Sequence, residues 1–153
     1  GKTVSRKVYD PNGNIIKEID AKGCLSGSTD DSRYGTLYTY DLANRPVKVV
    51  KPEAAVKGKY TSKYEYNQYG QKAADTDGLG NQTRYEYDND GKLVKVTDAL
   101  GTSTTYGYDR MGNKLYMTDG RGKMTKYGYG AFGKLTSYTD ADGCAIKYTY
   151  TLS

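Results

Sequence analysis

Short runs rich in Tyr, Val, Leu and Thr alternate along this chain with turns that begin at Asp or Asn and end at Gly. Residues 85–105 contain two such runs, and turns of this type follow them at 88–91 and 98–101. Tyr, Val and Thr favour strands. Asp at the first turn position and Gly at the fourth are typical of a type I turn, in which Gly closes the hairpin with a bulge. Because Gly recurs often and no apolar stripe follows the helical period, the pattern predicts β-hairpins and disfavours helix.

The hairpin pattern repeats at a fixed step of 21 residues. Two tyrosine columns, two glycine columns and an aspartate column keep this step, and in several units a further Asp follows the second Tyr. Such self-similarity is typical of an array in which each unit is covered by its neighbours, so we assign these positions a structural role. They are Tyr64, Tyr66, Gly70, Asp77, Gly80, Tyr85, Tyr87, Asp88, Gly91, Asp98, Gly101, Tyr106, Tyr108, Asp109, Gly112, Asp119, Gly122, Tyr127, Tyr129, Gly133, Asp140 and Gly143.

The period fits one hairpin, because two strands of about six to seven residues and two turns of about three to four consume it. We therefore predict an all-β fold: an antiparallel meander of about six tandem hairpins that forms one long twisted or curled sheet. Tyr85 and Tyr87 are two residues apart and project from one face, so successive hairpins build two tyrosine columns. Leu93 and Val96 on the second strand are expected to pack beside them.

The same register extends back to the N-terminus with two interruptions. In the turn at 41–44, Asn44 replaces the Gly, and Asn is the residue other than Gly that adopts positive φ most readily. We treat residues 1–153 as a single tandem array. Its units lie near 7–37 with a longer loop at 24–35, 38–63 with a longer loop at 51–62, 64–84, 85–105, 106–126 and 127–147, followed by a partial unit at 148–153.

Composition supports a thin sheet. Hydrophobic residues make up 36% of the chain, which has 18 Tyr, one Phe and no Trp, whereas a two-layer globule would contain more Leu, Ile and Phe. The formal net charge is +5, but the basic residues are scattered and Asp is as regularly spaced as Tyr, so a solvated face is favoured over nucleic-acid binding. Cys24 and Cys144 are five hairpins apart and are not expected to form a disulfide.

Candidate chemistry is sparse. The chain has no His, which excludes Ser-His-Asp and Cys-His catalysis and most zinc sites. Residues 75–80 resemble a calcium loop in part, but the full ligand set is missing and we interpret them as an ordinary turn. We expect no catalytic residue, no cofactor and no metal. No membrane segment or signal peptide is visible, and we interpret the chain as a segment of a longer protein.

The motif Tyr-x-Tyr-Asp-x-x-Gly, followed after six residues by Asp-x-x-Gly and then x-x-Thr, resembles the YD repeat of the Rhs family. Residues 87–91 and 98–104 carry it most fully, while Asn67 and Gly130 replace the Asp after the second Tyr in other units. The resemblance implies a β-sheet strip that winds into a hollow shell in large secreted or cell-surface proteins of bacteria. In toxin members the shell encloses a C-terminal toxic domain. The self-cleaving motif of such members is matched in part at 10–13, which we interpret as a turn.

Two functions follow as expectations. The first is a non-catalytic segment of an Rhs-type shell, whose partners are neighbouring repeats and a toxin or effector domain of the same parent chain. The alternative is a module that binds cell-surface carbohydrate through Tyr rings. Shell packing would bury these rings against second-strand residues, whereas sugar binding would leave ring faces open beside Asp, Asn or Lys. We also expect the half-unit at 148–151 to leave an open sheet edge for self-association.

Overall fold

The computed structural model describes residues 5–26, 31–52, 55 and 60–150, which divide into two compact units at residues 82 and 83. In the first unit the strands are β1 (Arg6–Tyr9), β2 (Ile15–Ile19), β3 (Gly35–Tyr40), β4 (Pro46–Val50), β5 (Ser62–Tyr66) and β6 (Lys72–Asp77). The strand β7 (Gln82–Tyr87) begins at the last residue of the first unit and lies otherwise in the second. The further strands of the second unit are β8 (Leu93–Thr97), β9 (Ser103–Tyr108), β10 (Lys114–Thr118), β11 (Met124–Tyr129), β12 (Leu135–Thr139) and β13 (Ala145–Lys147).

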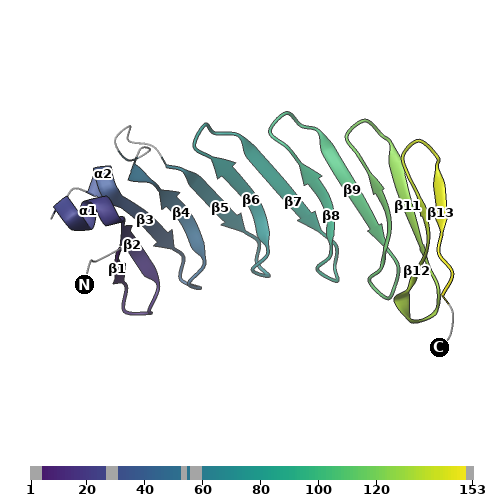
Figure 1. Ribbon diagram of the computed structural model, residues 1–153, viewed down its shortest axis with the longest axis horizontal. Coiled ribbons are helices and arrows are strands. Elements are labelled where there is room, and N and C mark those ends of the chain that lie inside the picture. The colour runs from purple at the N-terminus through teal and green to yellow at the C-terminus, as the bar shows by residue number, and fades with distance from the viewer. Residues whose placement is uncertain (1–4, 27–30, 53–54, 56–59, 151–153) are drawn as a thin grey trace. The chain divides into compact units, whose positions relative to one another are not determined.

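Each strand pairs antiparallel with the strands next to it in the sequence, from β1 to β6 in the first unit and from β7 to β13 in the second (Figure 1). The predicted all-β meander of tandem hairpins is therefore confirmed. The register shifts by one residue within the Tyr-x-Tyr segment, for example between Glu65 and Tyr66 and between Glu86 and Tyr87. This bulge is what a type I turn closed by a Gly of positive φ produces.

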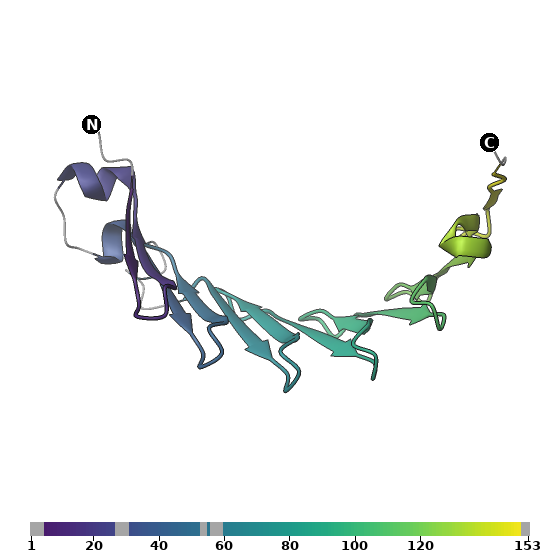
Figure 2. The same ribbon diagram turned by 90° about the horizontal axis from the view of Figure 1, so that it is seen from below.

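Short helices occupy part of the first predicted loop, residues 24–35, of which 27–30 lie outside the described residues. They are α1 (Ala21–Ser26) and α2 (Asp31–Tyr34), which lie beside the N-terminal strands in Figure 2. Asp20 caps α1, because its carboxylate accepts a hydrogen bond from the Gly23 amide at 2.8 Å. A Cβ at Gly23 would lie 2.6 Å from Ile19 and from Tyr34, so only Gly permits this packing.

The second interruption, predicted as a loop at 51–62, is described only at 51–52, 55 and 60–62. In the last predicted unit, the strand β13 ends at Lys147, although we expected Tyr148 to continue it. The Tyr148 amide still donates a hydrogen bond to the Thr136 carbonyl at 2.9 Å. Residues 151–153 of the predicted half-unit lie outside the described part.

Little of either unit is buried. Among the described residues, only the apolar side chains of Ile19 and Ala74, 3% and 4% exposed, and the polar side chain of Thr125, 7% exposed, are buried. The views of Figures 1 and 2 show no second sheet stacked on the strands of either unit. Tyrosine rings therefore supply most of the apolar contacts on the sheet. The hydrogen bonds between strands and within the turns contribute a large share of the stability of the fold.

Candidate functional site

The turns are the most regular feature of the chain, and Asp98 shows how they are built. Its Oδ1 accepts hydrogen bonds from the Leu100 and Thr102 amides at 2.9 and 2.8 Å, and the Gly101 amide donates to the Asp98 carbonyl at 3.0 Å. Gly101 has a φ of +83°, which Gly adopts without strain. The same carboxylate or amide geometry begins the turns at Asp10, Asp41, Asn67, Asp77, Asp88, Asp98, Asp109, Asp119 and Asp140.

The closing position of these turns has positive φ throughout, and Asn44, with φ of 59°, takes the place of Gly in one of them. The glycines are Gly13, Gly70, Gly80, Gly91, Gly101, Gly112, Gly122, Gly133 and Gly143. The turn at 130–133 differs because Gly130 stands where the others have Asp or Asn. Without that side chain the segment forms the short 3-10 helix η1 (Ala131–Gly133), and Phe132 takes a φ of 62°.

Hydrogen bonds hold the pKa of four turn carboxyls below the ordinary value for Asp. The largest cause in each case is a hydrogen bond from the side chain four residues later, and backbone amides of the turn add to it. The four pairs are Asp10 with Asn14, Asp41 with Arg45, Asp77 with Asn81, and Asp109 with Asn113. The hydrogen bonds within each turn therefore favour the charged form of its carboxylate.

We expect the chain to lose stability as the pH falls below about 4, the region in which an unfolded Asp takes up its proton. A carboxyl whose pKa is lower in the folded chain stabilises the fold fully above the unfolded pKa, and this contribution is lost as the pH falls through the folded pKa. Thermal unfolding followed by circular dichroism at neutral and at acidic pH measures the loss. Asn81→Leu should reduce it, because the largest cause at Asp77 is removed. Equal melting temperatures at both pH values would contradict the assignment.

In four hairpins the hydroxyl of the second Tyr forms a hydrogen bond to the preceding hairpin, and we call this bond the tyrosine tie. The Tyr108 hydroxyl donates to the Leu93 carbonyl at 2.9 Å, and Leu93 is the first residue of the return strand β8. The same bond joins Tyr40 to Ile15, Tyr66 to Pro46 and Tyr150 to Leu135. Burial raises the pKa of Tyr40 and of Tyr108, so these hydroxyls keep their protons. This bond explains why the column uses Tyr rather than Phe, a role that the sequence did not predict.

Tyr108→Phe is expected to lower the free energy of unfolding by about 1 kcal/mol, because the Leu93 carbonyl loses its donor while the ring stays. Tyr106→Phe is the matched control, because Tyr106 belongs to the first tyrosine column and lies on the same strand. Urea unfolding of both variants measures the difference. If the two substitutions cost the same, the hydroxyl does not act as a tie between hairpins.

The first tyrosine column carries rings that are half-buried. In the second unit the Lys114 amine lies 5.4 Å from the centre of the Tyr106 ring and 5.6 Å from that of Tyr127. The Tyr127 ring also meets Tyr138 edge-on, with ring centres 5.6 Å apart. The Leu93 and Val96 side chains, which we predicted beside the columns, are half-buried too.

A groove of about 340 Å³ opens on the first unit. It is lined by Tyr38, Tyr40, Pro46, Val49, Tyr64, Tyr66 and Lys72. Both tyrosine columns thus reach one face, as their spacing predicts. Four tyrosines therefore line this groove.

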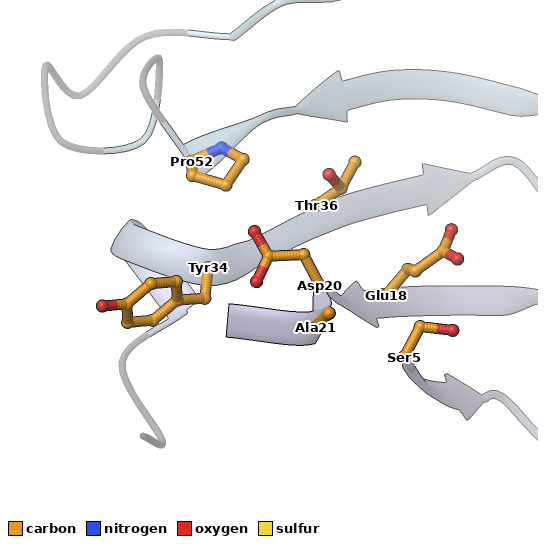
Figure 3. Close-up of a pocket in the computed structure, with 7 residues that line it drawn as sticks. All are labelled: Ser5, Glu18, Asp20, Ala21, Tyr34, Thr36 and Pro52. Atoms are coloured by element: carbon orange, nitrogen blue, oxygen red, sulfur yellow. The ribbon is translucent and has the colours of Figure 1, made fainter. Parts of the chain in front are cut away.

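A second hollow of about 360 Å³ lies where α1 and α2 meet the strands of the first unit (Figure 3). It is lined by Ser5, Glu18, Asp20, Ala21, Tyr34, Thr36 and Pro52. Its two carboxylates have partners within the fold, because Asp20 caps α1 and Glu18 lies 3.8 Å from the Lys7 amine. We therefore assign it no ligand.

The partial calcium loop at 75–80 is an ordinary turn. Asp77 holds the amides of Leu79 and Asn81, and Asp75 pairs with the Lys72 amine at 2.7 Å. Across the described part of the chain, no group of three or more acidic, His or Cys side chains could hold a metal ion.

Cys24 and Cys144 are free thiols. Within the residues that the structure describes, no helix is long and apolar enough to cross a membrane.

The fold and turns define a tandem β-hairpin repeat protein. The RHS Repeat model matches the chain three times in succession, at residues 66–99, 87–115 and 116–143. Together these matches cover just over half of the sequence, so the chain belongs to the RHS repeat family. The resemblance inferred from the Tyr, Asp and Gly columns is thereby confirmed. No curated protein matches the chain significantly.

Solved structures of Tc toxin components share the fold. The crystal structure of TcdB2-TccC3-Cdc42 aligns with 89% of this chain at a TM-score of 0.68 and 17% identity. The Photorhabdus luminescens Tc holotoxin pore with mutated TccC3 aligns with 89% at a TM-score of 0.68 and 18% identity. In both cases the chain spans only 7% of the length of the chain it matches.

Proposed function

We propose that this chain is a non-catalytic segment of the wall of an Rhs-type shell, and that the shell encloses or presents a toxin or effector domain of the same secreted or surface-exposed bacterial parent protein. Family membership and the fold shared with Tc toxin components support this proposal. The observation that carries it is the tyrosine tie, because Tyr66 and Tyr108 each fasten a hairpin to its predecessor. A wall built in this way lengthens by adding repeats and needs no other core.

Electron microscopy of the full-length parent protein tests the proposal. A closed, hollow particle is expected, and protease should spare the enclosed domain until the particle is opened by denaturant. The matched comparison is the parent protein in which the second Tyr of several repeats, among them Tyr66 and Tyr108, is changed to Phe. Its enclosed domain should become sensitive at lower denaturant concentration. An extended stalk with a fully exposed terminal domain would overturn the shell assignment.

Binding of cell-surface carbohydrate is the second candidate, and the tyrosine-lined groove of the first unit is the observation in its favour. Sugar faces stack on aromatic rings, and Lys72 offers a polar neighbour. Most of the Tyr side chains are only half-buried, so part of their surface is accessible to a ligand. Titration with methyl glucoside, read on the ring signals of Tyr38 and Tyr64, tests this candidate. Unchanged ring signals at high sugar concentration would dismiss it at this groove.

We also propose that the isolated chain associates through its edge strands, β1 and β13, which each pair on one side only. Unpaired backbone groups at a sheet edge accept further strands, and charged side chains oppose this. The exposed segment of β13 carries one charge, Lys147, beside Ala145 and Ile146. Sedimentation at rising concentration should show a dimer that Ile146→Lys weakens. A chain that stays monomeric at high concentration would contradict the proposal.

A further inference from the structure

One position of the repeat is filled by a cation in the second unit. The residue that opens β10 is Lys114, which lies opposite Tyr108 in the β9–β10 register. Its amine lies between the Tyr106 ring and the Tyr127 ring, at 5.4 and 5.6 Å from their centres. Both distances lie within the range in which a ring face attracts a cation, about 6 Å. Two successive rings of the first tyrosine column thus share one ammonium group.

The corresponding positions of the first unit are Ile15, Lys72 and Pro46, and Pro46 is the one on the strand between those of Tyr38 and Tyr64. It opens β4 and lies opposite Tyr40, as Lys114 lies opposite Tyr108. The next strand follows in the same register in both places, because Val49 pairs with Ser62 as Met117 pairs with Thr125. Tyr38 and Tyr64 therefore take the places of Tyr106 and Tyr127. Proline has neither the length nor the charge to take the place of the lysine.

The open groove lies at this position. Tyr38, Pro46 and Tyr64 all line it, and the second-column rings of Tyr40 and Tyr66 complete its tyrosine lining. Its volume, about 340 Å³, exceeds the space that a single alkylammonium group needs. The groove thus contains the two first-column rings of the arrangement seen at Lys114, and the one cation among its described lining residues, Lys72, is paired with Asp75.

Two basic side chains lie at the groove, and each has a carboxylate partner. The Arg45 guanidinium, which stacks 4.5 Å from the centre of the Tyr66 ring, pairs with Asp41 at 2.7 Å. The Lys72 amine pairs with Asp75 at 2.7 Å. Each basic group at the rim is therefore matched by a carboxylate, and Arg45 shows that a ring face of this groove already attracts positive charge.

We propose that the groove between Tyr38 and Tyr64 binds a primary alkylammonium group of the lysine side-chain type, in the place that Lys114 occupies in the second unit. The ring faces supply the attraction for the charge, and Pro46 and Val49 supply an apolar floor for the alkyl chain. This site is independent of the proposed shell role, because it rests on a single hairpin pair within one unit.

Nuclear magnetic resonance of the 153-residue chain with labelled Tyr rings tests the site. The probe is n-butylammonium, with n-butanol as the neutral molecule of the same chain length and sodium chloride to match ionic strength. Saturable shifts of the Tyr38 and Tyr64 signals are expected with n-butylammonium and not with n-butanol. Equal binding of the alcohol would reduce the groove to an apolar surface, and preferential binding of methyl glucoside would make it a sugar site. Either result overturns the proposal, as does the absence of saturable shifts.

Two substitutions exchange the properties of the two positions. Pro46→Lys should place the chain's own ammonium between the rings and weaken n-butylammonium binding by about tenfold or more, whereas Pro46→Ala should retain it. Lys114→Met should open a second site, seen as new shifts of the Tyr106 and Tyr127 rings. Amide spectra verify that each variant is folded. If Pro46→Lys binds the probe like the parent chain, or if Lys114→Met gains no site, the equivalence of the two positions is wrong.

Discussion

Replacing Ile19 by Ala is expected to lower the free energy of unfolding of the first unit by about 2–4 kcal/mol. Ile19 ends β2, is 3% exposed and is the larger of the two buried apolar side chains among the described residues. It pairs with Gly35 of β3, and its Cγ2 lies against Gly23 of α1. Truncation leaves a cavity at the point where the helices meet the sheet, and a thin sheet has few other side chains that can fill it.

The matched control is Ile146→Ala in β13, because Ile146 is 51% exposed. We expect this change to cost well below 1 kcal/mol, since little apolar area returns to water. Urea unfolding followed by circular dichroism compares both variants with the parent chain. Similar losses for Ile19→Ala and Ile146→Ala would show that burial at the helix junction does not stabilise the unit.

Gly101→Val is expected to destabilise the second unit by about 1–3 kcal/mol through backbone strain alone. Gly101 has a φ of +83°, and a Cβ placed there meets no atom within 4 Å. Steric overlap of the added Cβ with neighbouring atoms is thus excluded as a cause. A β-branched side chain resists positive φ most strongly, so the turn must either strain or open.

Two variants isolate this effect. Ala99→Val adds a similar side chain two residues earlier in the same exposed turn and should change stability little, because Ala99 does not have positive φ. Gly101→Asn should cost less than Gly101→Val, because Asn44 already occupies the same turn position with a φ of 59°. Thermal unfolding gives the ranking. If Ala99→Val costs as much as Gly101→Val, side-chain bulk and not backbone conformation limits the turn.

The hairpins could be predicted from the sequence because their determinants are local. An Asp, a Gly three residues later and the strand formers between turns lie within a few residues of one another, and together they set the bulge and the register. The two helices could not be predicted, because α1 depends on contact of Gly23 with Ile19 and Tyr34. These residues come together only after the chain has turned back on itself.

The tyrosine tie and the contact of Lys114 with two rings could not be predicted for a different reason. The acceptor of each tie is a backbone carbonyl, as at Leu93, and any residue type can provide it. The contrast between Lys114 and Pro46 becomes meaningful only once the register places both opposite the second Tyr. The periodic columns located the rings, whereas the partners of the rings required three-dimensional alignment of the repeats.

Each turn is closed by its own hydrogen bonds, so two of its four positions can accept substitutions. The hydrogen bonds that close a turn come from its first residue and its backbone, so the side chains at the second and third positions contribute none of them. Leu42, Tyr69 and Met111 occupy such positions and are largely exposed. The residues at these two turn positions can therefore change in evolution, or be replaced by epitopes or binding loops in protein engineering, while the strands keep their sequence.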